Sequence, residues 1–351
     1  MDTATQTDIA TGVKNAVTDI LGAIDQERER EIVTRRFGLT DRRETLEQIG
    51  ELLGITRERV RQLEKAILIR LKIAADDGKI PAVHDIERMI IRDLSEAGRV
   101  ARVSDLTDRL VGTKSDTINR AHVAFIAELA PNLIVVGEND NYHHAIGIKE
   151  YGDEKTIKSN VDEIVKTIKK HGEPLTIEEL HTKLSYENPS QVRALASISK
   201  FLAHLKDSWG LAKWPTVNPK NIRDKIYVIL ADNGKPMHFS DIAKSIKGSD
   251  FKRKDVTTQA IHNELIKDGR FVLIGRGIYA LDNWGFSKGT VADIITDVLK
   301  SATEPLHRDE IVKRVLKSRQ VKETTILLNL QSKPQFKRVA KATYSFDPDA
   351  K

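Results

Sequence analysis

Charged and amide side chains recur at helical spacing between positions 57 and 65. Arg57, Glu58, Arg61, Gln62 and Lys65 stand at i, i+1, i+4, i+5 and i+8, so a helix would place them on one side. An arginine suits the O6 and N7 acceptors of guanine, a glutamate the N4 donor of cytosine, and a glutamine the edge of adenine. The pattern therefore predicts DNA recognition. The alternative is a solvated helix face on which Glu58 pairs with Arg61 or Gln62.

Two helices are predicted to position these side chains. Thr45, with Gln48 three residues later, is typical of a capping box at the start of the first helix. Gly54 can end that helix, and Thr56 can cap the second one. Apolar residues at helical spacing form the core stripe of the second helix: Val60, Leu63, Ile67 and Leu71. Two helices, a glycine turn and a basic outward face indicate a helix-turn-helix whose second helix enters a major groove.

Two strings in this stretch, DQEREREIVTRRFGL and TLEQIGELLGITRERVRQLEKA, carry a family resemblance. With them, Asp25–Lys72 resembles region four of the primary sigma factor family, the segment that recognises the −35 promoter element. The resemblance implies base contacts by Arg57, Glu58 and Gln62. It implies contacts to the DNA backbone by Thr56, Arg59, Arg61 and Lys65. It also implies that the helix Asp25–Phe37 rests on the flap of the polymerase β subunit, which makes RNA polymerase core an expected partner.

The chain departs from a complete sigma factor in several ways. The resemblance covers about one-seventh of the chain, and no aromatic-rich segment of the kind that melts the −10 element appears elsewhere. Only about 24 residues precede Asp25, so we expect something other than a full sigma factor. The family often carries a lysine one place after Lys65, and that shift rotates the charge by about 100° around the helix.

Four later segments share one pattern of helix, short loop, helix, helix and an apolar, strand-like end. The aligned segments are SEAGRVARVSDLTDRL (95–110), KKHGEPLTIEELHTKL (169–184), ADNGKPMHFSDIAKSI (231–246) and SATEPLHRDEIVKRVL (301–316). This order of elements is that of a winged helix-turn-helix. The predicted fold class is therefore mainly α: a helical helix-turn-helix domain followed by a tandem array of winged-helix domains, each with a small β-hairpin.

The repeats predict where the domains begin and end. Residues 1–24 are expected to form an N-terminal tail and helix, with 1–12 as a loose tail, because they are polar and threonine-rich. The sigma region-four-like helix-turn-helix is predicted at 25–75. The winged helices are predicted at 81–150, 155–217, 220–285 and 286–348.

The third copy, at 220–285, resembles the HARE-HTH domain, a winged helix found in RNA polymerase delta subunits, chromatin proteins and restriction systems. Lys252, Arg253 and Lys254 precede its third helix, and Arg276 stands between two glycines in its hairpin turn. These four residues are candidate DNA contacts of a recognition helix and a wing. Neighbouring acidic residues lower the net positive charge around these four residues, so contact with a protein is an equal alternative.

The composition permits nucleic-acid binding but does not demonstrate it. The 351 residues include 57 Lys and Arg against 51 Asp and Glu, a formal net charge of +6. The chain has no cysteine, which excludes disulfides, thiolate metal sites and a cysteine nucleophile. No apolar run approaches the roughly 18 residues of a membrane span. We expect a bacterial, cytoplasmic, nucleoid-associated protein without membrane contact.

Several short strings resemble parts of enzyme sites but lack the partners that such sites need. They are Gly275-Arg276-Gly277, His307-Arg308-Asp309, Ser249–Lys252 and His143-His144. The first is better explained as a wing turn and the last as surface histidines. We therefore predict no enzyme, no metal site, no cofactor and no small-molecule substrate.

The sequence thus favours a sequence-specific DNA-binding transcription factor that recognises −35-like promoter DNA and contacts RNA polymerase. Two alternatives stay open. One is a delta-like RNA polymerase accessory subunit that acts by protein contact. The other is a DNA-binding component of a restriction or defence system.

Overall fold

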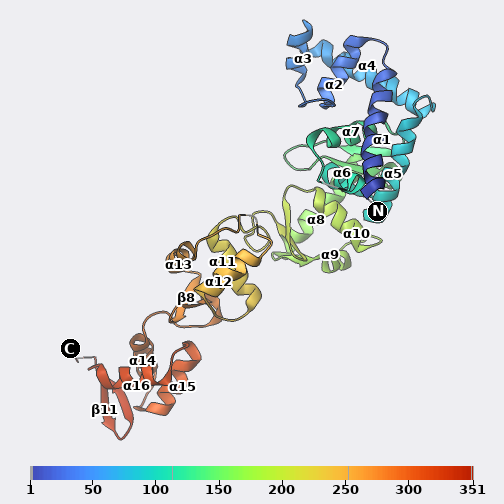
Figure 1. The fold of residues 1–351 in the computed structure, drawn as a ribbon. Coiled ribbons are helices and arrows are strands. Elements are labelled where there is room, and N and C mark those ends of the chain that lie inside the picture. The colour runs from blue at the N-terminus through green and yellow to red at the C-terminus, as the bar shows by residue number, and fades with distance from the viewer. Residues whose placement is uncertain (1–2, 113, 252, 349, 351) are drawn as a thin grey trace. The chain divides into compact units, whose positions relative to one another are not determined.

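The computed structural model describes residues 3–112, 114–251, 253–348 and 350 (Figure 1). The chain divides into two compact parts, an N-terminal part of residues 1–213 and a C-terminal part of residues 214–351. Among the described residues, helices alternate with short strands that form four three-stranded antiparallel sheets. The predicted fold class, mainly α with a helix-turn-helix and winged-helix units, is confirmed.

Four helices precede the first strand-containing unit. They are α1 (Thr3–Gly22), α2 (Glu27–Phe37), α3 (Leu46–Leu53) and α4 (Arg57–Asp76). Residues 1 and 2 lie outside the described residues, and the loose tail predicted for residues 1–12 is wrong from Thr3 onward, because α1 begins there. Its stripe of Val13, Ala16, Val17 and Ile20 is buried against α5, α6 and α7. Packing of an apolar face stabilises a helix more than the helix propensity of its residues does. The buried stripe therefore holds α1 as a helix, and its polar first turns extend that helix.

Each repeat has the order helix, short strand, two helices and two strands. The first comprises α5 (Pro81–Ala97), β1 (Val100–Arg102), α6 (Val103–Val111), α7 (Thr117–Leu129), β2 (Leu133–Val136) and β3 (Ala145–Ile148). The second comprises α8 (Glu154–His171), β4 (Leu175–Thr176), α9 (Ile177–Lys183), α10 (Pro189–Ile198), β5 (Leu202–Leu205) and β6 (Ser208–Leu211). A 3₁₀ turn, η1 (Lys149–Tyr151), separates them.

The C-terminal part repeats this order twice. The third unit comprises α11 (Ile222–Asn233), β7 (Met237–His238), α12 (Phe239–Gly248), α13 (Thr258–Lys267), β8 (Phe271–Gly275) and β9 (Ile278–Leu281). The fourth comprises α14 (Val291–Lys300), β10 (Leu306–His307), α15 (Arg308–Ser318), α16 (Glu323–Ser332), β11 (Phe336–Ala340) and β12 (Thr343–Phe346). The turn η2 (Asp282–Trp284) separates them.

The sheets show one element that sequence analysis missed. In every unit the last strand lies in the centre, in the orders β1-β3-β2, β4-β6-β5, β7-β9-β8 and β10-β12-β11. The short loop predicted between the first two helices of each unit is therefore a strand of two or three residues. Pairing with the central strand satisfies its backbone N–H and C=O groups.

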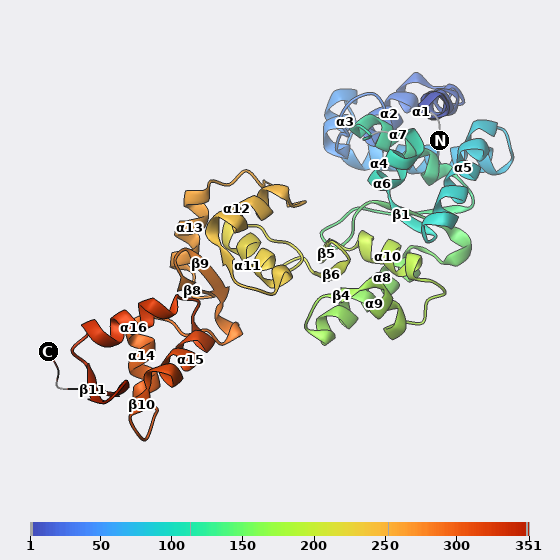
Figure 2. The ribbon, with the colours of Figure 1, turned by 60° about the horizontal axis from the view of Figure 1, so that its bottom comes forward.

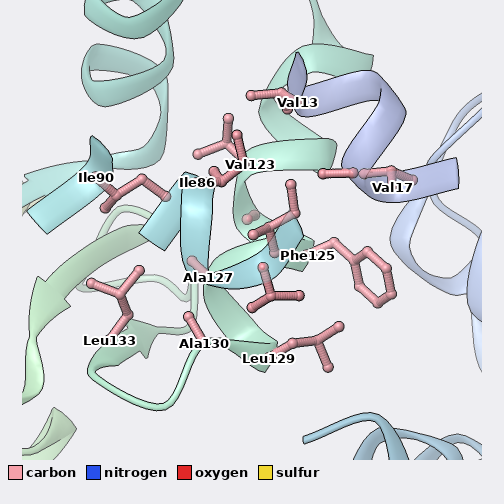
Figure 3. Close-up of a cluster of buried hydrophobic side chains, with 14 of the residues drawn as sticks. Val13, Val17, Ile86, Ile90, Val123, Phe125, Ala127, Leu129, Ala130 and Leu133 are labelled. Carbon is pink, nitrogen blue, oxygen red and sulfur yellow. The ribbon is translucent and has the colours of Figure 1, made fainter. Parts of the chain in front are cut away.

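One large core crosses a predicted domain boundary. It includes Val13 and Val17 of α1, Ile67 and Leu71 of α4, and residues of the first winged helix as far as Ile148. Figure 3 shows part of this cluster, in which side chains of α1, α5 and α7 converge. The domain boundary predicted between residues 75 and 81 therefore runs through one shared core. The other predicted boundaries stay predictions.

Candidate nucleic-acid interface

The N-terminal half of α4, which carries the candidate DNA contacts, is held by α2 and α3. Ile32 of α2, Ile49 of α3 and Val60 of α4 are fully buried against one another. Four partly buried residues surround them: Leu46, Leu53, Ile55 and Leu63. This small core fixes α4 along one side and leaves the opposite side to solvent.

The predicted turn between α3 and α4 is confirmed in its details. The Thr45 hydroxyl accepts from the Gln48 N–H, and the Gln48 side chain accepts from the Thr45 N–H, at 3.3 and 2.9 Å. Gly54 ends α3 in a left-handed conformation with φ of 64°. The Thr56 hydroxyl then accepts from the Arg59 N–H at 3.2 Å and caps α4. Local hydrogen bonds thus set the angle at which α4 leaves α3.

Gly50 is a structural requirement that sequence analysis missed. It lies inside α3, where a Cβ would stand 2.6 Å from the Ile55 carbonyl oxygen. The backbone of α3 therefore approaches the turn too closely for a larger residue. A glycine inside a helical pattern is the one sequence feature that points to such an approach.

Ionic contacts between distant residues also hold α4 in place. The Arg36 Nε lies 3.1 Å from Glu64 Oε1, and Arg70 pairs with the largely buried Glu29. Neither pair was predicted from the sequence, because a charge-rich helix offers many partners at such separations. Each pair ties α2 to a different turn of α4, so the two helices are joined along much of their length.

The structure brings all seven predicted sigma-like contact residues to exposed positions. They are Thr56, Arg57, Glu58, Arg59, Arg61, Gln62 and Lys65. Arg57, Arg59 and Lys65 make no ion pair with any described residue. Arg59 stands about 60° beyond Gln62 around the helix, so it lies at the flank of the face rather than at its centre. Three cationic groups are thus available to a polyanion.

Glu58 is already paired in this structure. Arg61 donates to both of its carboxylate oxygens, at 2.8 and 2.7 Å, and the Gln62 amide donates to it at 3.4 Å. The hydrogen bonds from Arg61 lower the pKa of Glu58 from its usual value. All three side chains are solvent-exposed, and an exposed ion pair is worth little. Rearranging them around a base edge therefore costs little free energy.

The winged-helix candidates lie in the C-terminal part. Lys252 lies outside the described residues. Arg253 and Lys254 are exposed, and the Arg253 carbonyl accepts from Lys225 Nζ at 2.7 Å. Arg276 is exposed in the two-residue turn between β8 and β9. The predicted wing turn is thus confirmed.

The helix-turn-helix segment matches a known family. Residues 26–72 match the family Sigma-70, region 4. We call this matched segment, residues 26–72, the region 4 module. The module contains α2, α3, the turn and most of α4, so the exposed face of α4 belongs to it. The resemblance inferred from the two sequence strings is thus confirmed over this segment.

Curated relatives match the same region. The chain is 47% identical over 60 residues to RNA polymerase principal sigma factor HrdD of Streptomyces viridifaciens, covering 17% of this chain and 18% of that protein. It is 43% identical over 61 residues to sigma factor SigA of Bacillus sp, covering 17% and 16%. It is 46% identical over 57 residues to sigma factor sigB of Arabidopsis thaliana, covering 16% and 9%. The chain thus spans less than a fifth of the length of each relative.

The described residues hold no feature typical of a membrane span or of a metal site. Among them, no helix is long and apolar enough to cross a membrane. Nor do three or more histidine, aspartate or glutamate side chains gather there in a way that would hold a metal ion. His143 and His144 are half-buried, and desolvation lowers the pKa of each.

Proposed function

We propose that the protein is a sequence-specific DNA-binding transcription factor whose region 4 module recognises −35-like promoter DNA. One observation carries the proposal. The exposed face of α4 presents the predicted DNA-contacting side chains within a segment that matches sigma-70 region 4. Most of the chain lies outside that match, so the action of the whole protein is part of the proposal.

Arg57, Glu58 and Gln62 are proposed to contact bases. They occupy the first two turns of α4, the end of a recognition helix that enters the major groove first. Arg57 has no ion-pair partner among the described residues and can donate to guanine. On DNA binding, the weak 3.4 Å hydrogen bond between Gln62 and Glu58 is replaced by base contacts, of Glu58 to cytosine and of Gln62 to adenine.

Backbone contacts are proposed for the residues around this centre: Thr56, Arg59, Arg61 and Lys65. Arg59, at the flank of the face, is placed to meet a phosphate beside the groove. Lys65 lies two turns further along α4 and is exposed. Phosphate contacts position a protein on DNA without sequence preference, so these residues supply affinity and the three base contacts supply selectivity.

RNA polymerase core is the proposed protein partner, through the β flap. The segment that carries this role in the resemblance is α2, and Glu27 and Arg28 are exposed at its beginning. The third winged helix, with its proposed HARE-HTH relationship, adds DNA contacts through Arg253, Lys254 and Arg276. Recruitment of polymerase to promoter DNA is the proposed mechanism.

The test is genome-wide occupancy of the full chain, combined with capture of RNA polymerase from the same cells. Binding at −35 elements together with polymerase capture supports the proposal, and Arg57→Ala should reduce the occupancy at these sites while leaving the capture. Polymerase capture without site-specific occupancy would instead support a delta-like accessory subunit. Absence of both would contradict the proposal and support a role in a restriction or defence system.

A further inference from the structure

The four winged helices differ in how far their third helix is covered. In the first two units this helix is α7 or α10, in which 7 of 13 and 6 of 10 residues are buried. In the last two units it is α13 or α16, in which 2 of 10 residues are buried. The third helix enters the major groove in this type of fold, so its exposure decides which units can receive DNA.

Neighbouring elements cover α7 and α10. Helix α7 packs against α1 and α4 (Figures 1 and 2), and α10 packs against β1 and α5 of the preceding unit. Arg102 also donates to the Ser197 carbonyl near the end of α10, and Arg99 pairs with Glu187. Neither α7 nor α10 therefore keeps a broad free face for a duplex.

The hairpins of the last two units differ as well. Four of the five residues of β8 are buried, and the Gln320 N–H, from the segment before α16, donates to the Ile274 carbonyl at 3.0 Å. In β11 only Phe336 is buried, and the rest of the strand is exposed. Phe336 and Tyr344 pack into one core with α14, α15 and α16, so the open part of the hairpin is its outer face and its turn (Figure 1). The fourth unit thus has both an open third helix and an open hairpin.

The exposed hairpin is strongly basic. Lys337 and Arg338 are consecutive in β11, so their side chains point to opposite faces of the ribbon, and both are exposed. Lys341 is exposed in the turn that follows. None of the three pairs with an acidic side chain of the described chain. Arg338 Nε donates to the Ala340 carbonyl at 3.3 Å, which leaves its terminal nitrogens for another acceptor.

The surrounding charge favours a polyanion. Residues 214–351 contain 25 Lys and Arg against 16 Asp and Glu, a formal net charge of +9. Residues 1–213 contain 32 against 35, a net charge of −3. The excess positive charge of the chain therefore belongs to the C-terminal part, where the open hairpin lies.

We propose that the β11–β12 hairpin is a further double-stranded DNA site, whose exposed cations contact backbone phosphates beside a groove. A groove of B-DNA admits a two-stranded ribbon and is flanked by phosphates on either side. Lys337 on the outer face, Lys341 in the turn and Arg338 beside Tyr344 are all exposed, so the three cations can reach phosphates along the edge of a groove. The site binds DNA of any sequence, so it goes beyond the −35 recognition proposed for α4.

The test measures binding of the full chain to a duplex of random sequence over a range of salt concentrations. The variant Lys337→Gln/Arg338→Gln/Lys341→Gln removes the three hairpin charges. The matched control, Lys166→Gln/Lys169→Gln/Lys170→Gln, removes three exposed charges from α8 and changes the net charge equally. Each lost phosphate contact lowers the slope of log affinity against log salt by about 0.9, so the hairpin variant should lose about 2.7 and the control none.

Other outcomes would overturn the proposal. Equal loss in both variants would mean that only net charge matters, and an unchanged slope in the hairpin variant would mean that the hairpin makes no DNA contact. Reduced polymerase capture with unchanged DNA affinity would assign the hairpin to a protein partner. The preference for −35 DNA over random DNA should survive in the hairpin variant, so failure here is distinct from failure of the α4 proposal.

Discussion

On the exposed face of α4, the Arg61 guanidinium holds the Glu58 carboxylate through two hydrogen bonds of 2.8 and 2.7 Å. One partner is a proposed base contact and the other a proposed phosphate contact, and they lie one helical turn apart. The pair orients the carboxylate before DNA arrives, yet its exposure keeps it easy to rearrange.

The pair should be visible in the titration of Glu58. Because Arg61 lowers the pKa of Glu58, Arg61→Ala should raise that pKa toward its usual value. A lowered pKa contributes stability that is fully present above the unfolded-state pKa and is lost as pH falls through the folded-state value. NMR titration of the Glu58 carboxyl in both proteins is the measurement. An identical pKa in the variant would show that the pair does not persist in solution.

Substitutions at two nearby arginines should separate selectivity from affinity. Arg57→Ala should cost about 1–3 kcal/mol on the cognate duplex and relax selectivity at one base pair, because it removes a base contact. Arg59→Ala should weaken binding to all sequences alike and flatten the salt slope by about one unit, because it removes a phosphate contact. Binding titrations on promoter and random duplexes measure both effects. Equal behaviour of the two variants on the two duplexes would contradict the assignment.

Gly50→Ala should destabilise the helix-turn-helix. The added methyl group would meet the Ile55 carbonyl oxygen, which is part of the backbone and cannot simply rotate away. Overpacking of this kind costs about 1–3 kcal/mol, measured by denaturant unfolding. Gly12→Ala, at a site where nothing lies within 4 Å, is the matched control and should leave stability nearly unchanged or slightly raised. Equal stability of both variants would show that the backbone around Gly50 and Ile55 shifts to admit the methyl group at little cost.

His122→Ala should loosen the junction between the region 4 module and the first winged helix. The buried His122 Nε2 donates to the Leu39 carbonyl at 2.7 Å, so its loss leaves a buried acceptor without a partner. The expected cost is about 1–3 kcal/mol, with faster amide hydrogen exchange around Leu39. His171→Ala, at an exposed position, should change neither quantity. Unchanged exchange around Leu39 would show that the apolar core alone holds the junction.

Local features of this chain are predictable from sequence, and features that depend on distant partners are not. The Thr45 capping box, the Gly54 helix end and the Arg276 turn each depend on a few neighbouring residues, and all three were predicted. The pairing of Glu29 with Arg70 depends on tertiary packing and was missed. So was the core that α1 shares with the first winged helix.

The same distinction applies to the DNA-binding surfaces. Residue type and spacing are enough to place the candidate contacts on the outward face of α4, because the buried stripe of one helix defines its exposed side. Equivalent reasoning gives all four winged helices an outward third helix. Only packing shows that α7 and α10 are covered, whereas α13 and α16 stay open.

The most direct test of the account is the affinity of the full chain for a duplex with a −35 element, relative to a scrambled duplex of the same length and salt. The account predicts a clear preference for the −35 duplex. Arg57→Ala/Gln62→Ala should reduce that preference by about thirtyfold or more, because two base contacts of about 1–3 kcal/mol each are lost. Equal affinity of the wild-type chain for both duplexes would contradict the account.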